Sequence, residues 1–203
     1  MVPQPVCISV AARPYPGETT SGDAWQVDWH GQTCRIAVID GLGHGAAAAT
    51  AARAATTVLA DHPELSVVEA VQRCHGALRG ARGAALLIAG IDVAMSALTV
   101  AGVGNVEALL WQYGRSQQLR TDRGIVGAVL PRLRPVELPI GADWTLLIHT
   151  DGIRSRFDMR ELLAATTDGN DIARTVLQEW GRPTDDATVL VAQPLTQESA
   201  SRR

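Results

Sequence analysis

Short apolar runs rich in β-branched residues recur along this chain, and they restrict its fold more than any other feature. The runs are separated by glycine, proline, asparagine and aspartate, which are turn residues. Runs of this length between turns are typical of β-strands, and short turns join neighbouring strands in antiparallel order. The sequence therefore predicts antiparallel sheets. The runs lie at residues 6–10, 24–29 and 35–39, at several places within 84–120, and at 144–149 and 187–192.

Four segments between these runs are typical of helices. The alanine-rich segment 46–60 has high helix propensity and is ended by an Asp-His-Pro sequence. A second helix is expected over 66–78, where a serine cap precedes apolar residues that fall on one helical face. Amphipathic patterns predict two further helices, near 159–165 and 171–180.

Together these segments predict the fold class α+β, as a sandwich of two packed antiparallel β-sheets flanked by α-helices. We expect residues 84–120 to form one antiparallel meander and the proline-rich segment 124–139 to be a loop. No interior linker or repeat divides the sequence, so we expect a single domain over 1–195 with a disordered tail at 196–203. We therefore expect neither a sensor domain nor a membrane domain, and we expect a monomer.

Composition excludes several classes of function. The net charge is only −3 and is evenly spread, whereas nucleic-acid-binding proteins usually carry a basic patch, so we expect no nucleic-acid partner. No apolar stretch approaches the roughly 20 residues of a membrane span, and no secretory signal is present, so we expect a cytoplasmic protein without membrane contact. All 18 basic residues are arginine, and the absence of lysine excludes a Walker loop and Schiff-base chemistry.

Aspartates stand at the ends of several predicted strands. Asp23 opens one strand, Asp40 and Asp151 follow apolar runs, and Asp185-Asp186 precede the last one. A carboxylate placed against apolar residues is costly unless a cation is bound, and clustered carboxylate oxygens suit Mg²⁺ or Mn²⁺. Any one of these aspartates could simply cap a turn, because Asp-Gly is a common turn dipeptide. Their joint pattern is what predicts a metal site.

The ordered motifs SGD, VIDGLGHG, VAGVGN, HTDGI and DDATVLV, between Ser21 and Val191, resemble those of the type 2C metal-dependent protein phosphatases. The similarity is to the bacterial branch named after the stage II sporulation phosphatase. It implies two Mn²⁺ or Mg²⁺ ions at one end of a sheet sandwich, and attack on phosphoserine or phosphothreonine by metal-activated water. By this resemblance Asp40 bridges both ions, Asp23 and the Gly41 carbonyl complete one site, and Asp151 with Asp185 or Asp186 holds the other.

Other roles are less directly matched. Larger members of the class have a histidine directly after the Asp-Gly pair, where this chain has Leu42; His44, two residues later, is either the acid for the leaving alcohol or a cap of the following helix. Larger members also hold the phosphate with an arginine near the first acidic motif; Arg13, ten residues before Asp23, is the nearest candidate here, with plain surface charge as the alternative. Arg132 and Arg134 in the proline-rich segment are candidate substrate contacts, with solvated loop charge as the alternative.

The resemblance extends to short members of the branch that reset the stressosome. It implies a phosphorylated STAS-domain regulatory protein as substrate and partner, within a stress-response or sigma-factor partner-switching pathway. Two alternatives stay open. One is a module that keeps the fold without catalysis, and the other is a dinucleotide-binding protein, because Gly41-Leu-Gly-His-Gly-Ala fits a glycine-rich phosphate loop with Asp61 downstream.

Overall fold

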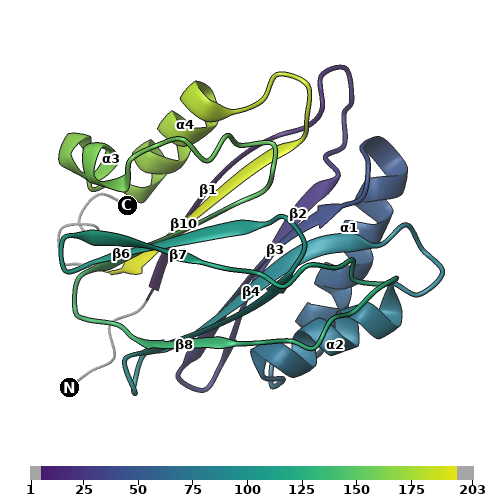
Figure 1. Ribbon diagram of the computed structural model, residues 1–203, viewed down its shortest axis with the longest axis horizontal. Coiled ribbons are helices and arrows are strands. Elements are labelled where there is room, and N and C mark those ends of the chain that lie inside the picture. Colours follow the sequence, from purple (N-terminus) through teal and green to yellow (C-terminus); the bar gives the residue numbers. More distant parts are fainter. Residues whose placement is uncertain (1–5, 196–203) are drawn as a thin grey trace.

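Ten strands of this chain form two five-stranded antiparallel sheets that pack face to face. The computed structural model describes residues 6–195, so the tail expected at 196–203 lies outside the described residues. The predicted α+β sandwich is confirmed, with helices outside both sheets (Figure 1). The order of strands across one sheet is β1 (Val6–Arg13), β10 (Ala187–Pro194), β9 (Trp144–His149), β6 (Glu107–Gln112) and β7 (Arg115–Leu119). The order across the other sheet is β2 (Asp23–His30), β3 (Thr33–Gly41), β4 (Ala84–Asp92), β5 (Ala97–Val103) and β8 (Val136–Pro139).

Two pairs of helices cover the outer faces of the sandwich. Helices α1 (Gly45–Asp61) and α2 (Val67–Ala77) pack on the sheet that contains β3, and α4 (Gly169–Trp180), preceded by the short α3 (Met159–Ala165), packs on the other sheet. The four predicted helices are confirmed. The start of α2 is fixed by a capping box in which Ser66 and Glu69 satisfy each other's backbone N–H groups. No helix in residues 6–195 is both long and apolar enough to cross a bilayer.

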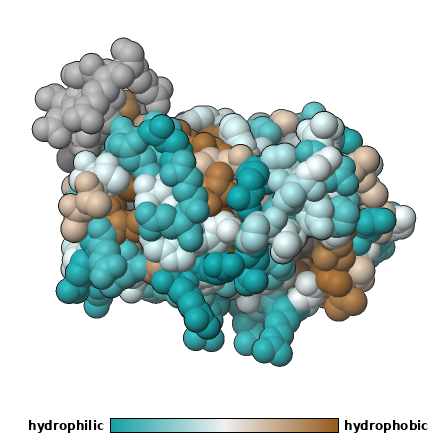
Figure 2. Space-filling view, turned by 90° about the horizontal axis from the view of Figure 1, so that it is seen from above, coloured by the Kyte–Doolittle hydropathy of each residue, from teal (hydrophilic) through white to brown (hydrophobic). Residues whose placement is uncertain are grey.

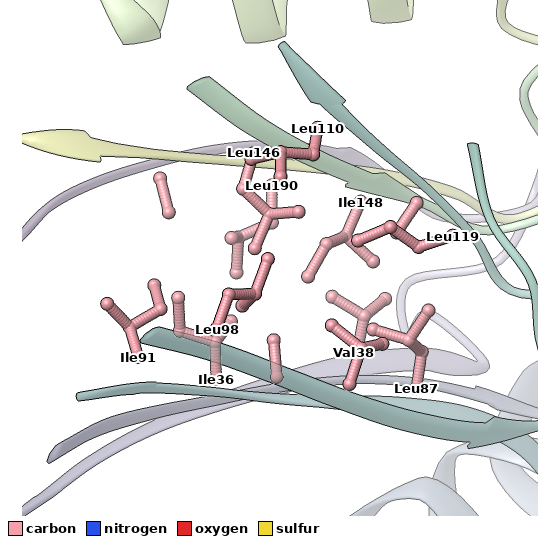
Figure 3. Close-up of a cluster of buried hydrophobic side chains, with 14 of the residues drawn as sticks. Ile36, Val38, Leu87, Ile91, Leu98, Leu110, Leu119, Leu146, Ile148 and Leu190 are labelled. Carbon is pink, nitrogen blue, oxygen red and sulfur yellow. The ribbon is translucent and has the colours of Figure 1, made fainter. Parts of the chain in front are cut away.

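The main core lies between the two sheets. Alternate residues of β3 and β4, such as Ile36, Val38 and Leu87, point toward Leu146 and Leu190 of the opposite sheet (Figure 3). The other faces of the sheets bury separate apolar clusters under the helices. Alanines of α1 are fully buried, which lets the helix lie close to β2 and β3. Both faces of the central strands are therefore largely apolar, and apart from Arg35 in β3 the charged residues of these strands lie at strand ends.

The predicted meander over residues 84–120 is wrong. Strands β4 and β5 pair in one sheet, but the chain then crosses over, so that β6 and β7 belong to the other sheet. Gly104 makes the crossing: its φ is +101°, and a Cβ there would lie 2.4 Å from the Ala85 Cβ. Val106, just beyond it, is buried in the core between the sheets. Alternating patterns predict strands but not the sheet to which each strand belongs.

The prediction that the segment 124–139 is a loop throughout is wrong. Its last residues form β8, an edge strand paired with β5. Proline is tolerated in an edge strand because its missing N–H group faces solvent. The dinucleotide-binding alternative is also wrong, because α1 leads into α2 rather than a parallel strand, and all pairings between the ten strands of residues 6–195 are antiparallel.

Arg35 is a charged residue in this apolar interior. It is 3% exposed, pairs with the Asp28 carboxylate at 2.9 Å, and donates to the Leu59 and His62 carbonyl oxygens at the end of α1. Arg35→Met removes the cationic partner of the buried Asp28 carboxylate and one donor from each of these carbonyls, so we expect a loss of about 3 kcal/mol in unfolding free energy, or roughly 10 °C in Tm. Thermal melts of the wild type and the variant measure it.

The double variant Arg35→Met/Asp28→Leu is the control for this prediction. It removes both charges, so no carboxylate is left uncompensated, and it should lose less stability than Arg35→Met alone. A single variant that melts within a degree or so of the wild type would show that the buried pair does not anchor α1.

Candidate active site

The first two acidic residues face each other across one strand pair. Asp23, at the start of β2, is the register partner of Asp40, near the end of β3. Side chains two residues apart on a strand point to the same face, so Asp40 lies on the face of Val38, toward the opposite sheet. Both aspartates are only partly exposed. These two carboxylates therefore lie side by side at one end of the core between the sheets.

Thr150 joins the two sheets at this end. It follows β9 and is fully buried; its hydroxyl donates to Asp23 Oδ2 at 2.7 Å and accepts from the Thr188 backbone N–H at 3.0 Å. Sequence reasoning did not single out Thr150, although it stands inside the HTDG motif. This contact holds Asp23, on one sheet, against the end of β9 and β10 on the other.

Asp151 is brought to the same end by the turn after β9. Asn105 Nδ2 donates to Asp151 Oδ2 at 2.6 Å, and Arg182 Nε donates to the Asp151 carbonyl oxygen at 2.8 Å. Gly152 makes the turn possible, because a Cβ there would lie 1.8 Å from the Asp186 carbonyl oxygen. The sequence analysis assigned no role to Asn105, which lies in the VAGVGN motif, and none to Arg182, which lies outside the motifs. Neither contact is visible in the sequence, because the partners lie 46 and 31 residues away.

Asp186 is the more buried member of the Asp185-Asp186 pair. It is 4% exposed, and its Oδ1 accepts from the Tyr15 backbone N–H at 2.8 Å. Its Oδ2 is buried without a hydrogen-bond partner in the described structure, close to Gly22. A buried carboxylate oxygen without a donor is unfavourable unless a cation or a proton satisfies it.

The five carboxylates of Asp23, Asp40, Asp151, Asp185 and Asp186 interact electrostatically. Burial raises the pKa of Asp40 to about 8, and the charges of the other four add to the effect. Burial also raises the pKa of Asp23 to about 7, although hydrogen bonds from Thr150 and Thr188 oppose it. The pKa of Asp185 is raised by burial and by Asp151. None of these five carboxylates forms an ion pair within residues 6–195, although the nearby Arg182 partly offsets the rise in the pKa of Asp185. We call these five residues the acidic cluster.

The donor chemistry of the acidic cluster fits a hard divalent cation. All of its side-chain donors are carboxylate oxygens, and one of them is buried and unpaired. Within residues 6–195, no three carboxylate, imidazole or thiol groups are already gathered as a ligand set. A cation would therefore have to draw the carboxylates inward. Gly41, whose carbonyl was the predicted backbone ligand, ends β3 directly under α1, where a Cβ would lie 2.3 Å from the Ala48 carbonyl oxygen.

His44 lies beside the cluster, at the start of α1. His44 is the N-cap residue by backbone position, as the capping alternative expected, but its side chain makes no capping hydrogen bond. The imidazole instead stacks on Tyr15, with ring centroids 4.3 Å apart, and its Nδ1 lies 3.6 Å from Glu18 Oε1. The ring is held in place while half of its side chain stays exposed.

The three predicted substrate arginines are not brought together. Arg13 is partly buried and donates from Nη2 to the Arg182 carbonyl oxygen, while its Nε is buried without a partner, so it is not a simple surface charge. Arg132 and Arg134 are exposed in the connection before β8, and no polar contact joins their side chains to the acidic cluster in the described residues. The Arg134 backbone N–H donates to Asp122.

A sandwich of two antiparallel sheets with helices outside and acids at one end defines a class, the type 2C (PP2C) protein phosphatases. The PP2C phosphatase domain of SpoIIE from Bacillus subtilis superposes with a TM-score of 0.79 at 18% identity, over 93% of this chain and 63% of that one. The chain matches the profile of the family "Stage II sporulation protein E (SpoIIE)" over residues 30–194, and it belongs to that family.

Two further comparisons narrow the similarity. The phosphoserine phosphatase RsbX of Bacillus subtilis (strain 168) is 24% identical over 178 residues, which are 87% of this chain and 89% of RsbX. A crystal structure of RsbX in complex with magnesium superposes with a TM-score of 0.85 at 23% identity, over 94% and 96% of the two chains. A structure from work on the bacterial stressosome, as a modular system adapted to control secondary messenger signalling, gives a TM-score of 0.87 at 29% identity, over 93% and 100%.

Proposed function

We propose that this protein phosphatase is a divalent-metal-dependent enzyme that hydrolyses phosphoserine or phosphothreonine on a regulatory partner protein. The observation that carries the proposal is the acidic cluster at the end of a phosphatase fold, where burial and neighbouring carboxylates raise the pKa of Asp40 and of Asp23. Mutual repulsion of this kind favours a bound cation. Two ions, Mn²⁺ or Mg²⁺, would balance the charge of five carboxylates more closely than one.

The acidic cluster would hold the ions, together with the Gly41 carbonyl. When bound, such ions activate water and neutralise the oxygens of the transferring phosphoryl group. Asn105 orients Asp151, and Thr150 orients Asp23, so both carboxylates keep their direction when the site is charged. His44, held by Tyr15 and Glu18, would deliver a proton to the leaving alcohol oxygen.

The partner class follows from the relatives. RsbX is described as a phosphoserine phosphatase, and another relative comes from work on the stressosome. We propose a phosphorylated STAS-domain protein of a stress-response or sigma-factor partner-switching pathway as substrate, and the cytoplasm as the compartment. An opposing kinase would then set the phosphorylation level of that protein.

The test uses the purified chain with Mn²⁺ or Mg²⁺. Release of phosphate from p-nitrophenyl phosphate is expected only when the metal is present, and chelation should abolish it. Phosphorylated STAS-domain proteins and unrelated phosphopeptides are then compared by mass spectrometry. We expect the STAS-domain proteins to lose phosphate faster.

The possible outcomes test the partner and the phosphatase activity separately. Equal rates on STAS-domain proteins and unrelated peptides would reject the partner while keeping the phosphatase. Neither metal uptake nor turnover on any substrate would instead favour the binding-module alternative.

A further inference from the structure

An open hollow of about 560 Å³ adjoins the acidic cluster and is lined by arginine. Arg154, Ser155, Arg156 and Arg182 form its wall, and the three arginines are exposed. The hollow begins at the candidate active site itself, because Arg182 Nε donates to the Asp151 carbonyl oxygen at 2.8 Å. A positively charged surface therefore lies directly beside a negatively charged one. We call it the arginine hollow.

Backbone pairing fixes the two segments that carry these arginines. The Arg182 N–H donates to the Gly152 carbonyl oxygen at 2.7 Å, and the Arg154 N–H donates to the Trp180 carbonyl oxygen at 2.9 Å. An isolated bridge between Ile153 and Gly181 lies between these bonds. The arginine side chains thus project from a braced turn. A braced turn loses less entropy on binding than a free loop would.

Nearby aromatic packing supports the same turn. The Phe157 ring packs against the rings of His149 and Trp180, each with centroids 5.6 Å apart. His149 is fully buried at the end of β9, so this packing connects the turn to the sheet. The position of the arginine hollow relative to the acidic cluster is therefore set by the fold.

The arginine hollow keeps most of its positive charge within the described part of the chain, where only Arg182 acts electrostatically on a carboxylate, that of Asp185. None of Arg154, Arg156 and Arg182 forms an ion pair there, in contrast to Arg35 and Arg174. Guanidinium groups present planar sets of donors that match carboxylate and phosphate oxygens. Hydrophilic residues cover much of the face that carries α3 and α4, with apolar patches between them (Figure 2), and the hollow itself is lined by three arginines and a serine. These features fit an anionic ligand.

We propose that the arginine hollow is a substrate subsite for a second anionic group, a carboxylate or another phosphate, carried by the protein substrate near the phosphorylated residue. The proposal rests on the proposed phosphatase function. The reacting phosphoryl group must lie at the acidic cluster, where a cation offsets its charge, so the hollow takes a neighbouring group of the same substrate. It gives the enzyme a preference for acidic flanks without using Arg132 or Arg134.

The experiment compares phosphoserine peptides that differ at one position. A single glutamate is placed in turn on each side of the phosphoserine, and each peptide has a glutamine match; a third set carries a second phosphoserine instead. For the best position we expect kcat/KM to be about fivefold higher with the anionic residue than with glutamine. The preference should shrink in high salt, because exposed charges are screened.

Variants assign the preference to the arginines. Arg154→Gln/Arg156→Gln should reduce the ratio of kcat/KM between anionic and neutral peptides to about one, and Arg154→Lys/Arg156→Lys should restore part of it. Arg115→Gln is the matched control, because this exposed arginine pairs with Gln112 at the far end of β6 and should leave the ratio unchanged. Melting curves check that each variant is folded.

The outcomes distinguish this proposal from the function on which it rests. No turnover of p-nitrophenyl phosphate or of any peptide would overturn the phosphatase function. Turnover without a flank preference overturns the subsite alone, as does a preference that survives Arg154→Gln/Arg156→Gln. An equal fall on every peptide would mean that the arginines hold the reacting phosphate, which also overturns the subsite. A preference for the second phosphate alone supports it and identifies phosphate as the ligand.

Discussion

Asp40→Asn and Asp151→Asn are each expected to reduce turnover at least about 1,000-fold while leaving the fold intact. Each change removes a charge from the acidic cluster but keeps the size of the side chain. Asp40 lies on the inter-sheet face opposite Asp23, and Asp151 is held by Asn105, so neither is replaceable by a mobile surface acid. Phosphate release in saturating Mn²⁺ measures the loss.

The metal-free stability of Asp40→Asn should rise, although its turnover falls. Burial and four neighbouring carboxylates raise the pKa of Asp40 to about 8, so its ionised form destabilises the metal-free fold. Asparagine carries no charge, and metal-free Asp40→Asn should therefore melt above the wild type at pH 8. A variant that is inactive only because it unfolds would melt lower instead.

The matched control is Asp61→Asn. Asp61 is exposed at the end of α1, away from the strand ends that carry the acidic cluster. Its turnover should equal that of the wild type. If Asp40→Asn or Asp151→Asn kept more than a small fraction of activity, the acidic cluster would not be the catalytic site.

The fold class and the convergence of the acids were predictable because both depend on local patterns. Strand periodicity and turn residues mark where strands end, and antiparallel pairing brings alternate strand ends to one edge. Asp23 and Asp40 illustrate this: they flank one hairpin, so their pairing follows from the turn between β2 and β3. A helix rich in alanine next to such strands is likewise a local signal.

The missed features depend on long-range contacts. Whether β5 continues into β6 within one sheet is decided by the turn at Gly104 and the burial of Val106, not by the alternation of either strand. Asn105 and Arg182 acquire their roles from partners 46 and 31 residues away. From the sequence alone Arg154 is an ordinary loop charge, and only the folded chain shows that its backbone N–H pairs with the Trp180 carbonyl oxygen at the end of α4. Tertiary packing supplied these contacts, and no short motif encodes them.

The metal-free protein is expected to lose stability as pH rises from about 5 to about 8. An unfolded aspartate titrates near pH 4, whereas the folded pKa values are about 7 for Asp23 and about 8 for Asp40. Between these values the folded state binds more protons than the unfolded state, so removing protons favours unfolding. The stabilising contribution is complete below pH 4 and is lost by about pH 8. The two shifts together correspond to a fall on the order of 6 kcal/mol in unfolding free energy, and because both groups are partly exposed we expect at least about 3 kcal/mol, or roughly 10 °C in Tm.

Mn²⁺ should reverse this trend, because metal ligands bind in their deprotonated form and a bound cation neutralises the cluster. At a hundred times its Kd the ion adds about 2.7 kcal/mol to the stability, and this gain grows as pH rises toward 8. Melting curves at several pH values, with Mn²⁺ or with chelator, measure both effects. In Asp40→Asn the metal-free slope should flatten, and the Mn²⁺ shift should largely disappear. Two results would contradict the prediction: a metal-free Tm that rises or stays constant between pH 5 and 8, or a melting curve unchanged by saturating Mn²⁺. Either would mean that ionising the buried carboxylates does not destabilise the fold, and the physical basis for a cation at this site would be lost.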